Sequence, residues 1–224
     1  DEQQCYTDDS KNLSVSDGKL NITAHKERVQ GLAWPEHMRS SDKRAVETKK
    51  QPFSSGRIRS LGKGDWRYGR FDIRAKLPTG QGTWPAIWML PTDEAYGGWA
   101  ASGEIDIMEA VNLGAKCKGC EGGKENRILG TLHYGGEWPD NKNSGEETPL
   151  PGVIDGYHTY SLVWSAGVMT WYVDGQRYAR QTFKDWNSKS AEAKGRLLAP
   201  FDQRFHMILN LAIGGSWPES VNSK

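Results

Sequence analysis

The stretch that decides the fold reads GEIDIME and spans residues 103–109. Its acidic and apolar residues alternate, as in a β-strand, where successive side chains point to opposite faces of a sheet. Strict alternation would place Glu109 on the apolar face, where an ionised carboxylate is very costly. One extra residue, a β-bulge at Ile107-Met108, returns Glu109 to the face of Glu104 and Asp106. The stretch therefore predicts a bulged strand with three carboxyl groups on one face.

The two outer carboxyl groups have a separation that fits cleavage of a glycosidic bond. Five residues of strand, one of them in the bulge, put the Cα atoms of Glu104 and Glu109 on the order of 13 Å apart, at ~3.3 Å per residue. Side chains that lean inward could reduce the carboxyl gap to about 5–5.5 Å, as in a retaining glycosidase, whereas an inverting pair stands wider apart. An acidic strand on a solvated face explains the same residues equally well, so the strand alone leaves both interpretations open.

Each acid has a distinct role in the catalytic interpretation. Glu104 would attack the anomeric carbon as the nucleophile, and Glu109 would serve first as general acid and then as general base. Asp106 would hold Glu104 by a shared proton or hydrogen bond, and would raise the pKa of Glu109 by like-charge repulsion. The three groups would then titrate as one coupled unit.

Similar strand patterns recur along the chain, and helical periodicity is scarce. Residues 70–77 alternate charged and apolar side chains, which favours a half-buried strand with a solvated face over a nucleic-acid surface. Asp174-Gly175 offers a tight hairpin turn, and only residues 185–198 could hold a helical turn or two. Further strands are expected within residues 130–134, 157–173, 176–180 and 206–213. Many strands with turns between them predict an all-β sandwich of two antiparallel sheets. If the sheets are curved, the concave face would hold a polymer.

Composition excludes several classes of partner. The chain has 224 residues and a formal net charge of +1, so no strong field points to nucleic acid. No apolar run reaches the ~18 residues of a membrane span, and no membrane partner is expected. Tryptophan stands out, with ten Trp against five Phe. Flat indoles suit stacking on sugar rings as well as core packing.

The cysteines are Cys5, Cys117 and Cys120. Cys117 and Cys120 have the spacing of a metal knuckle, but no second pair completes a zinc site. We therefore expect no metal there, and either a short loop disulfide or free thiols.

Seven motifs together resemble glycoside hydrolase family 16, and within it the laminarinases, which are endo-β-1,3-glucanases. The resemblance covers nearly the whole chain and favours the catalytic interpretation of residues 103–109 over an acidic strand on a solvated face. In the family's order the motifs are SGRI (55–58), WRYGRF (66–71), LPTGQGTWPAIWMLP (77–91), GEIDIME (103–109), GTLH (130–133), WYVDG (171–175) and LNLAIGGSWP (209–218).

This resemblance implies a β-jelly-roll sandwich of two curved antiparallel sheets, with the substrate in a concave cleft, and a retaining mechanism. Residues 1–224 would form a single catalytic domain. Met108 is the extra residue that separates laminarinase, agarase and carrageenase types from lichenase types. The implied substrate-binding residues are Trp88 and Trp99 flanking the cleaved sugar, Trp84 and Trp217 as weaker stacking candidates, and Arg57, Asn210 and His133 as polar cleft residues, with His133 near Glu109.

The resemblance also carries expectations about the chain ends. Family members usually have a strand region before the stretch matching residues 1–7 and a strand after the GGSWP segment, and we expect this chain to lack both. A second polypeptide that supplies the missing strands is then one expected partner. Many relatives bind a structural calcium across their termini, so the resemblance implies such an ion, but its ligands are not assignable from the sequence. The hydrolytic reaction itself should need no cofactor. The insertion at residues 116–126 would rim one end of the cleft. We expect a secreted, extracellular or periplasmic location.

The implied activity is hydrolysis of internal β-1,3-glucosidic bonds in laminarin-like β-glucan. Alternatives are action on mixed-linkage β-glucan, action on a galactan, transglycosylation, and non-catalytic β-glucan binding. A sulfated galactan would favour a cleft rich in Arg and Lys, and binding relatives typically lose the carboxylates that this chain keeps at Glu104, Asp106 and Glu109.

Overall fold

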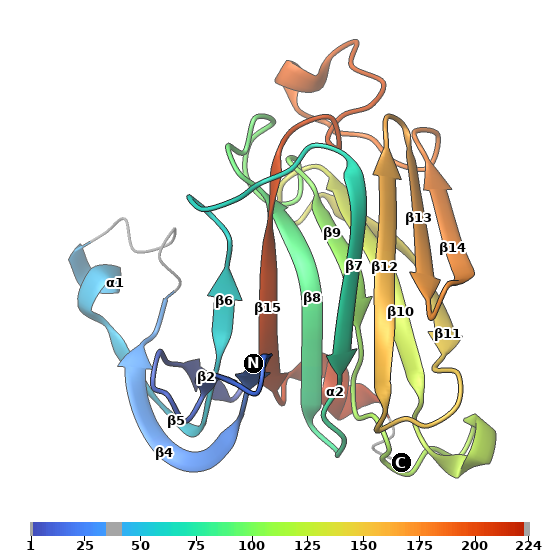
Figure 1. Cartoon of the computed structure of the whole chain (residues 1–224). Helices are drawn as coiled ribbons and strands as arrows, with labels where there is room; N and C mark the ends of the chain where they lie inside the picture. Colours follow the sequence, from blue (N-terminus) through green and yellow to red (C-terminus); the bar gives the residue numbers. More distant parts are fainter. Residues whose placement is uncertain (1, 35–41, 222–224) are drawn as a thin grey trace.

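The computed structural model describes residues 2–34 and 42–221, whose strands form two large sheets packed face to face (Figure 1). One sheet has six strands in the order β11-β10-β9-β8-β15-β6, and the other has four in the order β14-β13-β12-β7. Within each large sheet neighbouring strands are antiparallel. The bounds are β6 Arg57–Arg59, β7 Gly69–Lys76, β8 Thr83–Pro91, β9 Glu104–Glu109, β10 Arg127–Gly135, β11 Asn141–Pro149, β12 Tyr157–Ser165, β13 Val168–Val173, β14 Gln176–Thr182 and β15 Phe205–Ile213.

The space between these sheets holds the main hydrophobic core. Ile105, Ile107 and Met108 of β9 are at most 1 % exposed and face this core. Trp164 of β12 and Trp171 of β13 meet them from the four-stranded sheet. Burying a large aromatic side chain stabilises the fold by roughly 1.5–3 kcal/mol, so this layer orients β9. Its other face carries the acidic residues.

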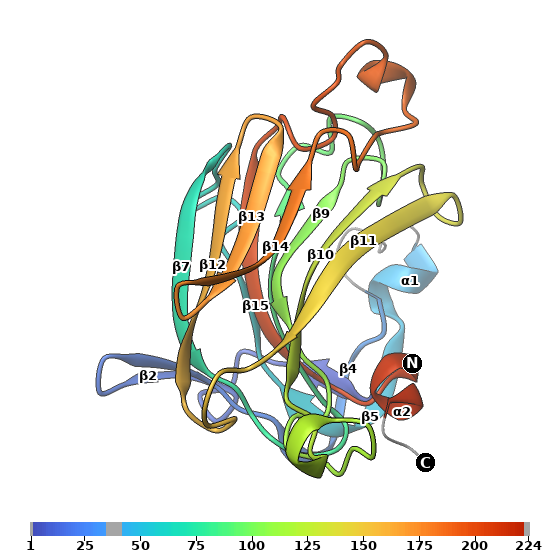
Figure 2. The ribbon, with the colours of Figure 1, turned by 90° about the vertical axis from the view of Figure 1, so that its right-hand side faces the viewer.

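Two smaller sheets and two short helices lie beside β6 and at the lower end of the sandwich in the view of Figure 1. The strands β1 (Gln4–Tyr6), β5 (Thr48–Ser55) and β4 (His25–Leu32) form a three-stranded sheet, and β2 (Leu13–Ser16) pairs with β3 (Lys19–Ile22). The short helices are α1 (Asp42–Val46) and α2 (Ser216–Ser220). Figure 2 shows α2 beside the lower ends of the six-stranded sheet, whose strands β10 and β11 curve strongly.

The structure confirms the predicted all-β sandwich of two curved antiparallel sheets. Residues 157–173 form β12 and β13, and Asp174-Gly175 turns the chain into β14 with φ angles of 48° and 78°. Residues 185–198 contain one 3₁₀ turn, Ala191–Ala193. The sequence did not predict α1 or α2. Within the described residues, no helix is long and apolar enough to cross a membrane.

Candidate active site

The bulge predicted in β9 is present. Against β8, Met108 pairs with Ile87 and Asp106 pairs with Trp88, so Ile107 has no partner of its own. The pairing of β9 with β10 shifts at the same place. Because the extra residue absorbs one step of the alternation, two consecutive side chains enter the core and Glu109 returns to the face of Asp106.

His133 of β10 lies beside two of the three acids. It is directly opposite Glu104 in the strand register. Its Nε2 is 3.2 Å from Asp106 Oδ2 and 3.7 Å from Glu104 Oε1. His133 therefore contacts the Glu104 and Asp106 end of the strand, and its charge also lowers the pKa of Glu109, in agreement with the expected place near that residue.

Burial governs the titration of these acids. It raises the pKa of Glu104 to about 8, with the charge of Asp106 as the next cause. Burial also raises the pKa of Asp106 well above its usual range, and raises that of Glu109. Like-charge repulsion was the expected cause at Glu109, but desolvation raises its pKa, and the Trp84 N–H and the charge of His133 lower it. Repulsion instead raises the pKa of Asp106, from the charge of Glu109. Asp106 is 2 % exposed and its Oδ2 faces His133 Nε2, and burial disfavours the charged form of its carboxyl group.

Two indole N–H groups bind the outer carboxyl groups. Trp99 Nε1 donates to Glu104 Oε2 at 2.7 Å, and Trp84 Nε1 donates to Glu109 Oε1 at 3.0 Å. Each donor favours the charged carboxylate and so lowers its pKa. The sequence predicted both tryptophans as stacking surfaces for sugar and gave no sign that their ring nitrogens face the acids.

A cleft of about 690 Å³ opens beside Glu104. Arg57, Trp88 and Trp99 line it, as predicted for cleft residues, and the Arg57 guanidinium lies 4.9 Å from the centre of the Trp88 ring. Sequence reasoning missed further lining residues for which no motif gave a signal, among them Tyr6, Arg59 and His206.

Asn210 contacts other cleft residues with both ends of its amide. Its Oδ1 accepts a hydrogen bond from Trp88 Nε1 at 2.7 Å, and its Nδ2 donates to the Tyr6 hydroxyl at 3.0 Å. Asn210 therefore orients the lining of the cleft, and its role toward substrate stays a prediction. Trp217 stands edge-on to Trp84, with ring centres 5.1 Å apart and planes at 88°.

The four-stranded sheet also supports the catalytic strand. Trp171 Nε1 donates to the Asp106 carbonyl oxygen at 2.9 Å across the core. This approach depends on Gly130 of β10, where an added Cβ would lie 2.5 Å from Trp171 Cδ1. The glycine of the GTLH motif thus admits the indole that binds the backbone beside the bulge.

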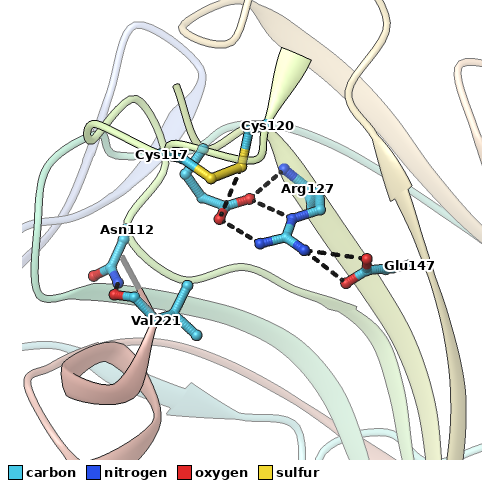
Figure 3. Close-up of a disulfide and its surroundings, with 7 residues drawn as sticks. Asn112, Cys117, Cys120, Arg127, Glu147 and Val221 are labelled. Atoms are coloured by element: carbon cyan, nitrogen blue, oxygen red, sulfur yellow. Dashed lines mark hydrogen bonds and ion pairs between the residues drawn. A yellow bond between two sulfur atoms is a disulfide. The ribbon is translucent and has the colours of Figure 1, made fainter. Parts of the chain in front are cut away.

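The insertion at residues 116–126 contains a disulfide between Cys117 and Cys120, which settles the alternative left open above. Cys5 is a buried free thiol. Figure 3 shows the disulfide beside Arg127, whose guanidinium binds Glu125 and Glu147. The insertion lines a separate hollow of about 290 Å³, and none of the described residues that line the larger cleft belongs to it. The expectation that it rims that cleft is therefore not supported.

Two groups of described side chains come within reach of a common cation: Cys117 with Cys120 and Glu125, and Glu104 with Asp106 and His133. In the first, both sulfur atoms are in the disulfide and Arg127 already neutralises Glu125. The second contains the proposed nucleophile. Calcium prefers six to eight oxygen ligands, and neither group among the described residues is an oxygen-only set, so we assign no calcium ligands.

Comparison with known proteins places this geometry among carbohydrate-cleaving enzymes. A family model described as glycosyl hydrolases family 16 matches residues 2–220. The chain is 41 % identical to glucan endo-1,3-beta-glucosidase A1 of Niallia circulans over 96 % of its own length, and spans 29 % of that protein. It is 38 % identical to a glucan endo-1,3-beta-glucosidase of Cryptopygus antarcticus, again over 96 % of the chain and 71 % of that protein. The laminarinase structure from Rhodothermus marinus superposes with a TM-score of 0.71 at 32 % identity, covering 97 % of this chain and 75 % of that one.

Proposed function

The chain belongs to glycosyl hydrolases family 16, and on that premise we propose that it hydrolyses internal β-1,3-glucosidic bonds of laminarin-like β-glucans with retention of configuration. The observation that carries the proposal is the bulged strand β9, which brings the buried Asp106 and the partly exposed Glu104 and Glu109 to one face, with a separate indole donor on each outer carboxyl group. The names of the similar proteins support the choice of β-1,3-glucan.

The first displacement forms a glycosyl-enzyme. The Glu104 carboxylate attacks the anomeric carbon while Glu109 gives its proton to the glycosidic oxygen, and the bond between that carbon and oxygen breaks. Burial raises the pKa of Glu109, which favours the protonated form that this step uses. Asp106 carries the shared proton and donates it in a hydrogen bond to Glu104. A neutral Asp106 also removes the negative charge that would otherwise raise the pKa of Glu104.

The second displacement releases the sugar. The Glu109 carboxylate removes a proton from water, the water oxygen bonds to the anomeric carbon, and the ester bond to Glu104 breaks. The carboxyl groups return to their starting charges, and the product keeps the β configuration. This chemistry needs no metal or organic cofactor.

Substrate binding is proposed along the cleft beside Glu104. Trp88 and Trp99 offer aromatic faces to the sugars there, and Arg57 lies over the Trp88 ring. His133 contacts the carboxyl groups of Glu104 and Asp106, and the Trp84 N–H binds Glu109. Asn210 acts through the Trp88 ring to which it is hydrogen-bonded, and Trp217 acts through the Trp84 ring against which it packs. The partner is the polysaccharide, with no nucleic acid or membrane involved.

We also propose a location outside the cytosol, because disulfides such as Cys117–Cys120 persist in oxidising compartments. Detection of the protein only in the cytosolic fraction of its source cells would contradict that location.

The decisive experiment compares active-site variants on defined substrates. Glu104→Ser should lose laminarin turnover and keep laminarin binding. Glu109→Ala should still form the glycosyl-enzyme from an activated aryl β-glucoside, with azide restoring release as the β-azide. The control Glu121→Ala removes an exposed carboxyl from the insertion, outside the cleft, and should match the wild type.

Two further measurements define the reaction. Proton NMR of the first products should show β anomers, and early α product would refute retention. A panel of laminarin, lichenan, agarose and carrageenan, read by new reducing ends, should favour laminarin. Preference for agarose or carrageenan would assign the cleft to a galactan, and binding of laminarin without turnover by the wild type would make the chain a binding protein.

A further inference from the structure

Asn112 occupies an unusual position just after the catalytic strand. It lies three residues beyond Glu109, is 0 % exposed, and has a positive φ of 58°. Few residues other than glycine accept this backbone conformation, and asparagine is one of them. Its backbone N–H donates to the Thr83 carbonyl at 2.9 Å, which fixes the end of β9 to the first residue of β8.

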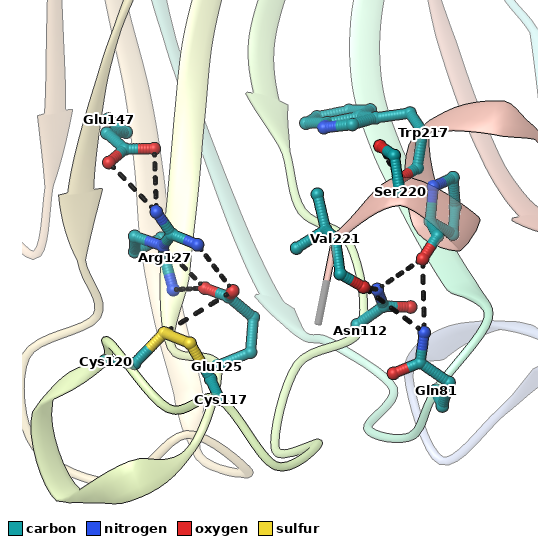
Figure 4. A network of polar contacts seen from close by, with 11 residues as sticks. Gln81, Asn112, Cys117, Cys120, Glu125, Arg127, Glu147, Trp217, Ser220 and Val221 are labelled. Carbon is teal, nitrogen blue, oxygen red and sulfur yellow. Dashed lines mark hydrogen bonds and ion pairs between the residues drawn. A yellow bond between two sulfur atoms is a disulfide. The ribbon is translucent and has the colours of Figure 1, made fainter. Parts of the chain in front are cut away.

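The Asn112 side chain binds two further segments that are distant in sequence. Its Oδ1 accepts a hydrogen bond from the Gly82 N–H at 2.7 Å. Its Nδ2 donates to the Pro218 carbonyl at 2.8 Å and to the Val221 carbonyl at 2.9 Å. Figure 4 shows Asn112 beside Val221 and Gln81 at α2. Both N–H bonds of the amide and its oxygen are used, so the residue pairs with the Pro218 carbonyl of α2, the Val221 carbonyl just after it and the Gly82 N–H before β8.

The segments joined by Asn112 carry the aromatic residues next to Glu109. Gly82 and Thr83 directly precede Trp84, whose indole N–H binds the Glu109 carboxyl. Trp217 is in α2 and packs edge-on against the Trp84 ring. Moving either segment would change the position of the Trp84 ring nitrogen. A hydrogen bond to a charged group weakens steeply with distance and angle, so a small displacement is enough to lose it.

We propose that Asn112 is a positioning residue for Glu109, because it fixes the start of β8 and α2 so that the Trp84 N–H is held on the Glu109 carboxyl. The proposal rests on the proposed acid and base role of Glu109. A purely structural Asn112 would stabilise the fold without changing how Glu109 titrates.

The test measures the titration of Glu109 without substrate. Protein labelled with ¹³C at the glutamate carboxyl carbons gives the pKa of Glu109 by NMR, with the Glu109→Gln spectrum as the assignment. Trp84→Phe removes the N–H and should raise this pKa by about one to two units. Asn112→Gly keeps the positive φ and removes all three side-chain hydrogen bonds. The Asn112→Gly variant should raise the Glu109 pKa by at least half as much as Trp84→Phe does. The double variant should raise this pKa only slightly more than Trp84→Phe alone, because both substitutions act through one contact.

Control variants separate positioning from general stabilisation. Gln81 Nε2 also donates to the Pro218 carbonyl, at 3.1 Å, but the bond that fixes Gly82 belongs to Asn112. Gln81→Ala should therefore lower the melting temperature and shift the Glu109 pKa less than Asn112→Gly does. If Asn112→Gly does not fold, Asn112→Ser replaces it, because the serine is neutral and adds no charge near Glu109, while its shorter side chain loses the donations to the Pro218 and Val221 carbonyls.

An unchanged Glu109 pKa in the folded Asn112 variant, with a shift in Trp84→Phe, would overturn the proposal. Additive shifts in the double variant would overturn it as well. Failure of the wild type to cleave laminarin would refute the proposed function and leave this titration readable, so the two failures are distinguishable.

Discussion

Trp99→Phe isolates one hydrogen bond at the proposed nucleophile. The substitution keeps an aromatic ring beside His133 and removes the N–H that lies 2.7 Å from Glu104 Oε2. The Glu104 side chain is 15 % exposed, so water replaces the lost donor only in part. Because the N–H stabilises the charged carboxylate, its removal raises the pKa of Glu104.

The size of the effect follows from the strength of such bonds. A hydrogen bond to a charged group contributes about 1.5–3 kcal/mol, and about 1.36 kcal/mol corresponds to one pKa unit. The pKa of Glu104 should therefore rise by about one to two units. Since Glu104 must be charged to attack, the acidic limb of the pH dependence of kcat/KM should move to higher pH by the same amount, while the basic limb, set by Glu109, stays in place.

The assay is kcat/KM on laminarin measured across the pH range, which reports the free enzyme. At pH values below the shifted limb, kcat/KM of the variant should be about 10- to 100-fold lower than that of the wild type. At higher pH this difference should shrink. Trp66→Phe is the control, since Trp66 is 40 % exposed and packs edge-on against Phe71 away from the acids. An equal loss at every pH would refute the reasoning, because it would mean that Trp99 contributes only sugar contact.

Other predictions concern the same strand. Asp106→Asn should leave the acidic limb of kcat/KM in place and keep the rate at the optimum within about tenfold, because the amide imitates a neutral Asp106 that still donates to Glu104; a limb moved to lower pH would mean that a charged Asp106 had been raising the pKa of Glu104. Deleting Met108 removes the extra residue and the bulge together, so strict alternation still places Glu109 on the face of Glu104 and Asp106, and the variant should still unfold cooperatively on heating. Met108→Leu keeps the register and should cost under about 1.5 kcal/mol by denaturant unfolding, and loss of the cooperative transition in the deletion variant would contradict the bulge argument.

Local pattern was sufficient for much of the fold. The alternation in residues 103–109 predicted both the strand and its bulge, because a carboxylate and a methylene chain differ by many kcal/mol in their preference for water. The hairpin turn at Asp174-Gly175 was also readable, since its two positive φ angles demand such residues. α2 was not predicted. It has five residues and is held by side chains such as Asn112, 106 residues earlier in the chain.

The sequence by itself determined which face of β9 carries the acids and, through the resemblance of its motifs, the family to which they belong. Only the tertiary structure decided how those acids are held. The Trp99 and Trp84 ring nitrogens, His133 opposite Glu104, and Tyr6 on Asn210 are brought together by strand register and packing. The physical reason is that alternation depends only on whether each residue prefers water or the core, which is a local property of the sequence. A hydrogen bond depends on the distance and angle between two atoms, and the whole fold sets their positions.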